Sequence, residues 1–112
     1  MEALVKNLEQ EKVLTLQDQV SYEEGKVVSL TLAQRPGVAA TLFAFDAGEG
    51  ISSHAAPGDA IATILDGTAE ITLNGTPHTL HAGECIVMPA GAPHAVKAVT
   101  RFKMYLVVVK AG

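Results

Sequence analysis

The chain has 112 residues, of which 48% are apolar and 18% are charged, and its formal net charge is −4. This length is typical of one domain, and the apolar fraction is sufficient for one packed core. The acidic balance, with no cluster of Lys or Arg, argues against nucleic acid and against an anionic membrane surface as partners.

The start of the chain lacks the apolar stretch of a signal peptide, and the longest apolar run, at 38–45, is too short to span a bilayer. The single cysteine, Cys85, cannot form an internal disulfide and fits a reducing compartment. We therefore expect a cytoplasmic protein. Cys85 lies in an apolar strand pattern and is expected to be buried as a small hydrophobic residue.

The first residues carry apolar side chains at helical spacing. Leu4, Val5 and Leu8 predict a short helix over 2–10. After this segment no helical period separates the expected strands, which argues against a doubly wound α/β fold. We expect residues 1–25 to form an N-terminal extension and residues 26–112 to form one β-barrel domain.

The remainder of the chain alternates short strand patterns with turn sequences. A strand over 27–32 ends at Arg35-Pro36-Gly37, and a strand over 38–45 follows it. Asp66-Gly67 and Asn74-Gly75 predict hairpin turns, and Asn74-Gly75 is the stronger signal because a type I′ turn needs two residues with positive φ. The other expected strands are 61–65, 69–73, 78–81, 85–88, 95–99 and 101–110. Strands of this length and spacing predict an all-β barrel or sandwich.

Glycines and prolines mark the expected reversals of the chain. Gly67, Gly75, Gly83 and Gly91 stand where the chain is expected to turn, because glycine tolerates positive φ. Pro89 and Pro93 bracket a stiff corner between two strands. This corner is expected to present His94 at the start of the next strand.

Two segments match a pair of spaced motifs. In the first, Gly48, His54 and Gly67 agree with a glycine, five residues, His-x-His, a short gap, Glu, six residues and a glycine. Ala56 stands at the second His position and Ala60 at the Glu position. In the second, Gly83, Pro89, Gly91 and His94 agree with a glycine, five residues, Pro-x-Gly, two residues and His, while Ala98 stands at a final Asn position.

With these motifs, residues 40–109 resemble the cupin superfamily, in particular its small single-domain members with a type-2 conserved barrel. The resemblance implies a jelly-roll β-barrel, often a homodimer, with a site inside the barrel mouth. It also implies that the positions of His54, Ala56, Ala60 and His94 converge there, where the family holds a metal with three His and one Glu.

Only two of those four ligands are present in this chain. Two imidazoles leave a divalent metal short of the three or four protein ligands of a tight site. We expect no resident cofactor, and at most a weakly bound divalent metal at His54 and His94. Asp59 adjoins the Glu position. Strand alternation points it to the other face, unless a kink at Pro57-Gly58 turns it inward as a substitute ligand.

The small side chains at these positions predict space inside the barrel. We expect a small-molecule pocket lined by His54, Ala56, Ala60, Ala62, Met88, His94 and Met104. Larger neighbours offer an alternative, because they could fill the gap as ordinary core; the candidates are Phe43, Phe45, Met88, Phe102, Met104 and Tyr105. Phe43 and Phe45 share one face of their strand, and Phe102 and Met104 share one face of theirs. His78 and His81 differ in parity and are expected at the surface.

Four functions are consistent with the sequence, which leaves open whether the protein is an enzyme. The first is small-molecule binding in the barrel. The apolar segments 27–34 and 38–45 also predict a homodimer, because together they exceed what one small barrel can enclose. The second is a metal-dependent cupin enzyme, of the dioxygenase or isomerase type, with a two-His site. The third is metal-free acid–base catalysis by a histidine, as in sugar-nucleotide epimerases of the same broad fold. The chain has only two arginines, Arg35 and Arg101, which argues against a site for a nucleotide phosphate. The fourth is a purely structural dimeric domain.

Overall fold

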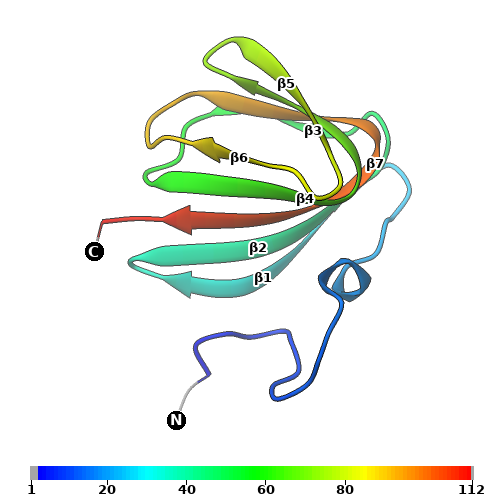
Figure 1. The fold of residues 1–112 in the computed structure, drawn as a ribbon, viewed down its shortest axis with the longest axis vertical. Coiled ribbons are helices and arrows are strands. Elements are labelled where there is room, and N and C mark those ends of the chain that lie inside the picture. Colours follow the sequence, from blue (N-terminus) through cyan, green and yellow to red (C-terminus); the bar gives the residue numbers. More distant parts are fainter. Residues whose placement is uncertain (1–2, 112) are drawn as a thin grey trace.

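The computed structural model describes residues 3–111, and within them the chain folds almost entirely into strands (Figure 1). The single helical element of residues 3–111 is one 3₁₀ turn, η1 (Leu16–Gln19). None of the described helices is long and apolar enough to cross a membrane. The strands are β1 (Val27–Arg35), β2 (Val38–Phe45), β3 (Gly50–His54), β4 (Asp59–Leu73), β5 (Thr76–His81), β6 (Cys85–Met88) and β7 (His94–Val109).

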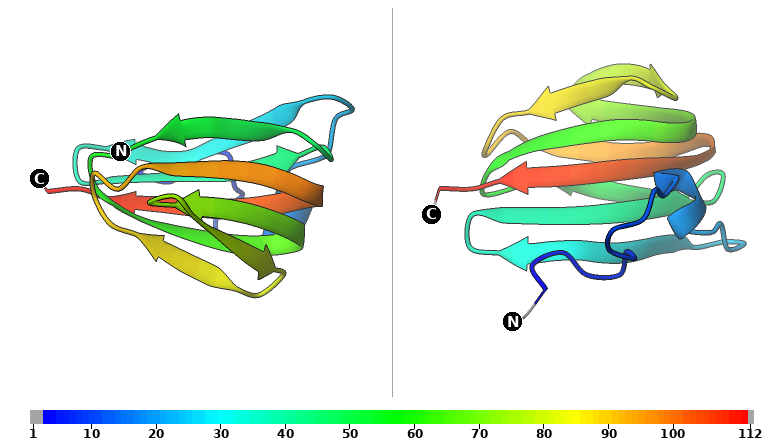
Figure 2. Two further views of the ribbon diagram at one scale, coloured as in Figure 1. Left: turned by 90° about the horizontal axis from the view of Figure 1, so that it is seen from above. Right: turned by 60° about the horizontal axis from the view of Figure 1, so that its bottom comes forward.

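All seven strands are antiparallel and are organised around the long pair β4 and β7. The C-terminal half of β7 pairs with β2, which pairs with β1, and the start of β4 pairs with β6. The N-terminal half of β7 pairs with β3, and the end of β4 pairs with β5. The two long strands thus belong to both walls of a jelly-roll β-barrel, which confirms the expected fold class (Figures 1 and 2).

The predicted hairpin at Asp66-Gly67 is wrong, because β4 runs through this point as one strand. Its register against β7 shifts between Ile64 and Asp66 and again between Gly67 and Ala69. These irregularities let the strand bend from one wall to the other. Gly67 has φ +75°, and a Cβ there would lie 1.8 Å from the carbonyl oxygen of Arg101.

Other sequence predictions have mixed outcomes. The hairpin at Asn74-Gly75 is confirmed, with φ values of 51° and 80°. The strands predicted at 38–45 and 85–88 are confirmed, including their first and last residues. The segments 95–99 and 101–110 form the single strand β7, and β3 has no counterpart among the predicted strands.

The predicted helix over 2–10 is wrong for residues 3–10; residue 2 lies outside the described residues. Asn7 and Glu11 have φ values of 65° and 56°, which an α-helix does not allow. The backbone N–H of Lys6 donates to Leu32 O at 2.8 Å, and the side-chain amide of Asn7 donates to Thr31 O at 2.6 Å. Hydrogen bonds to the edge of β1 therefore replace those of a helix.

The N-terminal segment covers part of the outer face of the sheet (Figure 2). Leu8, Leu16, Val20 and Tyr22 pack with outward-facing side chains of β1, β2, β4 and β7. Of the three residues with helical spacing, Leu8 thus docks on the sheet, whereas Leu4 and Val5 stay exposed. Those outward-facing side chains are Val28, Leu30, Leu32, Ala33, Ala40, Leu42, Ala44, Leu65, Tyr105 and Val107.

Polar contacts fix this segment at the bend of the long strands. The Asp46 carboxylate accepts hydrogen bonds from Gly25 N at 2.7 Å and from Arg101 Nε at 2.8 Å, and these contacts lower the pKa of Asp46 to about 2. The Tyr22 hydroxyl donates a hydrogen bond to the Asp66 carboxylate. The pKa of Tyr22 is raised mainly by burial of the hydroxyl and further by this hydrogen bond. Lys103 lies over the Tyr22 ring and donates to Gln17 O. These groups tie 17–25 to the barrel.

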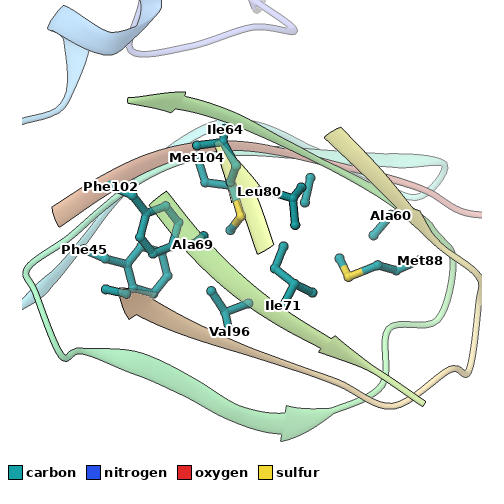
Figure 3. Close-up of a cluster of buried hydrophobic side chains, with 12 residues drawn as sticks. Phe45, Ala60, Ile64, Ala69, Ile71, Leu80, Met88, Val96, Phe102 and Met104 are labelled. Carbon is teal, nitrogen blue, oxygen red and sulfur yellow. The ribbon is translucent and has the colours of Figure 1, made fainter. Parts of the chain in front are cut away.

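The inner faces of the two walls enclose one apolar core (Figure 3). Phe45 and Phe102 stack at one end of this core, with ring centroids 4.4 Å apart, and Met88 and Ala60 lie at the other end (Figure 3). Strand alternation places Phe43 with Phe45, and Phe102 with Met104, on this inner side. The remaining buried members are Ala60, Ala62, Ile64, Ala69, Ile71, Leu80, Met88, Val96 and Ala98.

We predict that Gly67→Ala destabilises the protein far more than Gly75→Ala. Both glycines have positive φ, which costs an alanine about 1–2 kcal/mol. A Cβ at Gly75 meets nothing within 4 Å, whereas one at Gly67 collides with the backbone of β7. We expect a loss of at least about 3 kcal/mol for Gly67→Ala, measured by urea unfolding. Equal losses in the two variants would contradict the close approach of β4 and β7 at this point.

Candidate functional site

Two histidines face each other across the pair formed by β3 and β7. His54 is the last residue of β3 and His94 is the first residue of β7, and they are register partners. Their ring centroids are 4.3 Å apart, with the planes inclined at 63°. His94 is only 4% exposed, whereas His54 is open to solvent. The pair therefore has one buried ring and one accessible ring.

Backbone carbonyls select the tautomer that each ring adopts in its neutral form. His54 Nδ1 lies 3.0 Å from Ser52 O, and His94 Nδ1 lies 3.2 Å from Ala92 O. A carbonyl oxygen only accepts hydrogen bonds, so Nδ1 must carry the proton in each ring. Each Nε2 then has a lone pair, which can accept a hydrogen bond or ligate a metal.

The corner that presents His94 is held from two sides. Ala90 N donates to the Asp59 carboxylate at 2.8 Å, and Gly91 N donates to Ala56 O at 3.0 Å. Asp59 is exposed while its neighbour Ala60 is buried, so the carboxylate faces away from the barrel interior. Asp59 therefore positions the corner and does not replace the missing Glu.

The alanines that predict a cavity lie in packed surroundings. Ala60, Ala62 and Ala98 are at most 2% exposed and belong to the core cluster, together with Met88 and Met104 (Figure 3). Most of the larger residues named as candidate fillers are part of this packing, namely Phe43, Phe45, Met88, Phe102 and Met104. The expectation for Tyr105 is wrong, because it packs in the outer cluster.

Ala56 lies apart from the other alanines. It is half-buried in the irregular segment between β3 and β4, and its carbonyl contacts the corner. The structure therefore brings together Ala60, Ala62, Met88 and Met104 within the core, and His54 with His94 beside the corner.

The residues present do not fit a tight metal site. Within 3–111, no group of three or more His, Cys, Asp or Glu side chains is placed to hold a metal ion. The two imidazoles offer two neutral nitrogen ligands, and Ala56 and Ala60 offer none. A site of this composition lacks both the ligand number and the negative charge that stabilise a bound divalent metal.

The remaining polar candidates lie at the surface. His78 and His81 are both exposed, and His81 Nδ1 lies 3.2 Å from Thr68 Oγ1. The expectation that Cys85 is buried is wrong, because it is exposed. Cys85 is the first residue of the short strand β6 and has the opposite parity to the buried Met88. Sequence analysis missed the supporting role of Asp59, which only the position of the corner reveals.

The sequence matches the model of a family described as "Cupin domain" over residues 41–110. A conserved protein of unknown function from Streptococcus pyogenes has a structure similar to this chain, with a TM-score of 0.96 and 45% identity over 99% of this chain and 97% of that one. A cupin superfamily protein from Desulfitobacterium hafniense is similar with a TM-score of 0.92 and 35% identity over 97% and 100% of the two chains.

A cupin 2 conserved barrel domain protein from Leptotrichia buccalis is 42% identical over 87% of this chain, with a TM-score of 0.85. The match covers 47% of that longer chain. The comparison with curated proteins found no significant match.

We predict that restoring the two absent ligands creates metal affinity. The double change Ala56→His with Ala60→Glu adds an imidazole and a carboxylate, each of which is expected to tighten Zn²⁺ or Ni²⁺ binding by at least about tenfold. Calorimetry after chelator treatment measures this. Metal at 1,000 times its Kd is then expected to stabilise the variant by about 4.1 kcal/mol.

The matched control is Ala56→His with Ala62→Glu, which buries the same carboxylate one strand repeat away. This control is expected to bind metal no more tightly than the single variant Ala56→His. Stoichiometric metal of sub-micromolar affinity in the parent protein would show that the two histidines already form a working site.

Proposed function

This chain belongs to the cupin family, and we propose that it binds a small organic molecule at the barrel end where His54 and His94 face each other. One observation carries the proposal: the two rings lie 4.3 Å apart, and both Nδ1 atoms are engaged by backbone carbonyls. The neutral pair offers two Nε2 acceptors. A ligand that donates through a hydroxyl or N–H group is therefore the best chemical match.

The proposed lining is His54, Ala56, Ala60, Ala62, Met88, His94 and Met104. In the described structure the deeper members of this set are enclosed by the core. A ligand that reached Ala60 would have to displace Met88, its register partner on β6. Methionine is flexible and changes rotamer at low cost, which makes this the adaptable side of the proposed pocket.

A metal-dependent enzyme, of the dioxygenase or isomerase type, is the second candidate function. Its supporting observation is the same pair of Nε2 lone pairs, which are the atoms by which histidine ligates metals. Such an enzyme would need further metal ligands from the protein, and Ala56 and Ala60 do not supply them. We therefore rank it below metal-independent binding.

We predict that His54→Ala abolishes ligand binding while the fold is retained. His54 is exposed, so removing its ring leaves the core intact. A thermal-shift screen of small hydroxylated compounds is expected to find ligands that stabilise the parent by about 2.7 kcal/mol at 100 times Kd. The same compounds are expected to leave the variant unshifted.

His81→Ala is the matched control, because it removes an exposed imidazole at the end of β5. Ligands that stabilise His54→Ala as strongly as the parent would place the binding site elsewhere. If compounds act only in the presence of added divalent metal, the enzyme candidate moves to first place.

We also propose a homodimer, formed through the outer face of β4 and β6. The outer faces of β1 and β2, which motivate a dimer in the sequence, are largely occupied by the N-terminal segment. Beyond that segment, Ile61 and Val87 are register partners and stay exposed by 38% and 56%. Val107 on β7, the register partner of Ile61, is half-buried and joins this row to the outer cluster. Burial of the row against a second copy would remove apolar surface from water.

Light scattering at micromolar concentration is expected to give the mass of two chains for the parent and of one chain for Val87→Glu. The exposed Val99→Glu is the control, since Val99 lies on β7 outside this row. A monomer mass for the parent would refute the dimer.

A further inference from the structure

No backbone pairing joins β5 to β6, and we call the interval between these two strands the seam. Both strands pair with the same edge of β4, β5 with 68–73 and β6 with 60–63. Because β4 bends between these two stretches, the strands diverge from the short turn at 82–84 and do not pair with each other (Figures 1 and 2). This seam is a separate feature from the histidine pair, which lies between β3 and β7.

A pocket of about 380 Å³ lies in the seam beside the turn at 82–84. Its volume lies within the range of small-molecule sites. Leu80, which is buried, and Ile86, which packs against the core, are its apolar members. The polar lining residues are His78, Thr79, Glu84 and Cys85.

The single carboxylate of this lining is held in place. Glu84 Oε1 accepts a hydrogen bond from His81 N at 2.8 Å, and Glu84 O accepts one from Ile64 N at 2.9 Å. Gly83 N donates to Ile64 O at 2.8 Å, which fixes the turn to the bend of β4. The turn thus orients the Glu84 carboxylate before any ligand arrives, and Oε2 remains available as an acceptor.

The charge of the lining residues favours a cationic ligand over an anionic one. Glu84 is its one formal charge, and none of the six lining residues is Lys or Arg. An anion would meet an uncompensated carboxylate, whereas a protonated amine would gain a charge-assisted hydrogen bond. The net charge of −4 on the whole chain also favours the approach of a cation.

We infer that the seam between β5 and β6 is a second binding site, specific for a small organic amine with an apolar body. The ammonium group binds the Glu84 carboxylate, with the His78 imidazole as a further acceptor on the same lining. The apolar body lies against Leu80 and Ile86. This site is independent of the proposed function at His54 and His94, and one site can be lost without the other.

The test is a ¹H–¹⁵N NMR titration of the full chain with benzylamine, benzyl alcohol and benzoate, which share the ring and differ in charge. Benzylamine is expected to shift the amide signals of 78–86, and the other two compounds to bind at least about tenfold more weakly. Equal binding of benzoate or benzyl alcohol, or no shifts in 78–86, would overturn the inference. These outcomes need only the parent protein.

Glu84→Gln then tests the named contact. The amide oxygen of Gln can still accept from His81 N, so the turn is preserved while the charge is lost. Benzylamine affinity is expected to fall about tenfold in Glu84→Gln and to stay unchanged in Glu23→Gln, which alters an exposed carboxylate before β1. Unchanged affinity in Glu84→Gln overturns the inference. Shifts centred on His54 and His94 also overturn it, while leaving the proposed function intact.

Discussion

The crossing of β4 and β7 is the constraint on which the rest of the structure depends. These two strands stay paired from Asp59↔Val109 to Leu73↔His94, and their register shifts on both sides of Gly67. The shifts change strand parity, so that Ala60, Ala62 and Ile64 before the bend and Ala69 and Ile71 after it all face the same core. A regular strand could not bury both sets. The bend requires the backbones to approach so closely that only glycine fits at position 67.

Both proposed sites are consequences of this geometry. Because β7 is shared by two walls, its first residue, His94, meets His54 of β3 where the second wall begins. Because β4 is shared in the same way, its outer edge is divided between β5 and β6, which do not pair with each other. The histidine pair offers neutral acceptors, whereas the seam offers a carboxylate. Within one chain segment, 76–94, the seam and the histidine pair therefore carry different polar groups.

Ala56 and Ala60 offer no nitrogen or oxygen side-chain donor to a metal. Ala60 belongs to the apolar core, where it is the register partner of Met88. On the opposite face of the sheet, the N-terminal segment supplies a second apolar layer. Asp46 and Arg101 fasten that layer beside the bend, so that the same point of β7 supports the core inside and the segment outside.

The sequence by itself determined the features that depend on neighbouring residues. The Asn74-Gly75 turn, the strands at 38–45 and 85–88 and the motif positions of His54 and His94 follow from local conformational preference and fixed spacing. Tertiary structure decided the features that depend on distant partners. Asp66-Gly67 has the composition of a turn, yet pairing with Phe102 and Lys103 keeps it within a strand. Leu4, Val5 and Leu8 have helical spacing, yet the segment is irregular. Lys6 and Asn7 donate hydrogen bonds to β1, and Leu8 packs on the apolar outer face of the sheet. The exposure of Cys85 and the seam beside it arise from how β4 bends, because long-range pairing outweighs local preference wherever both act on the same residues.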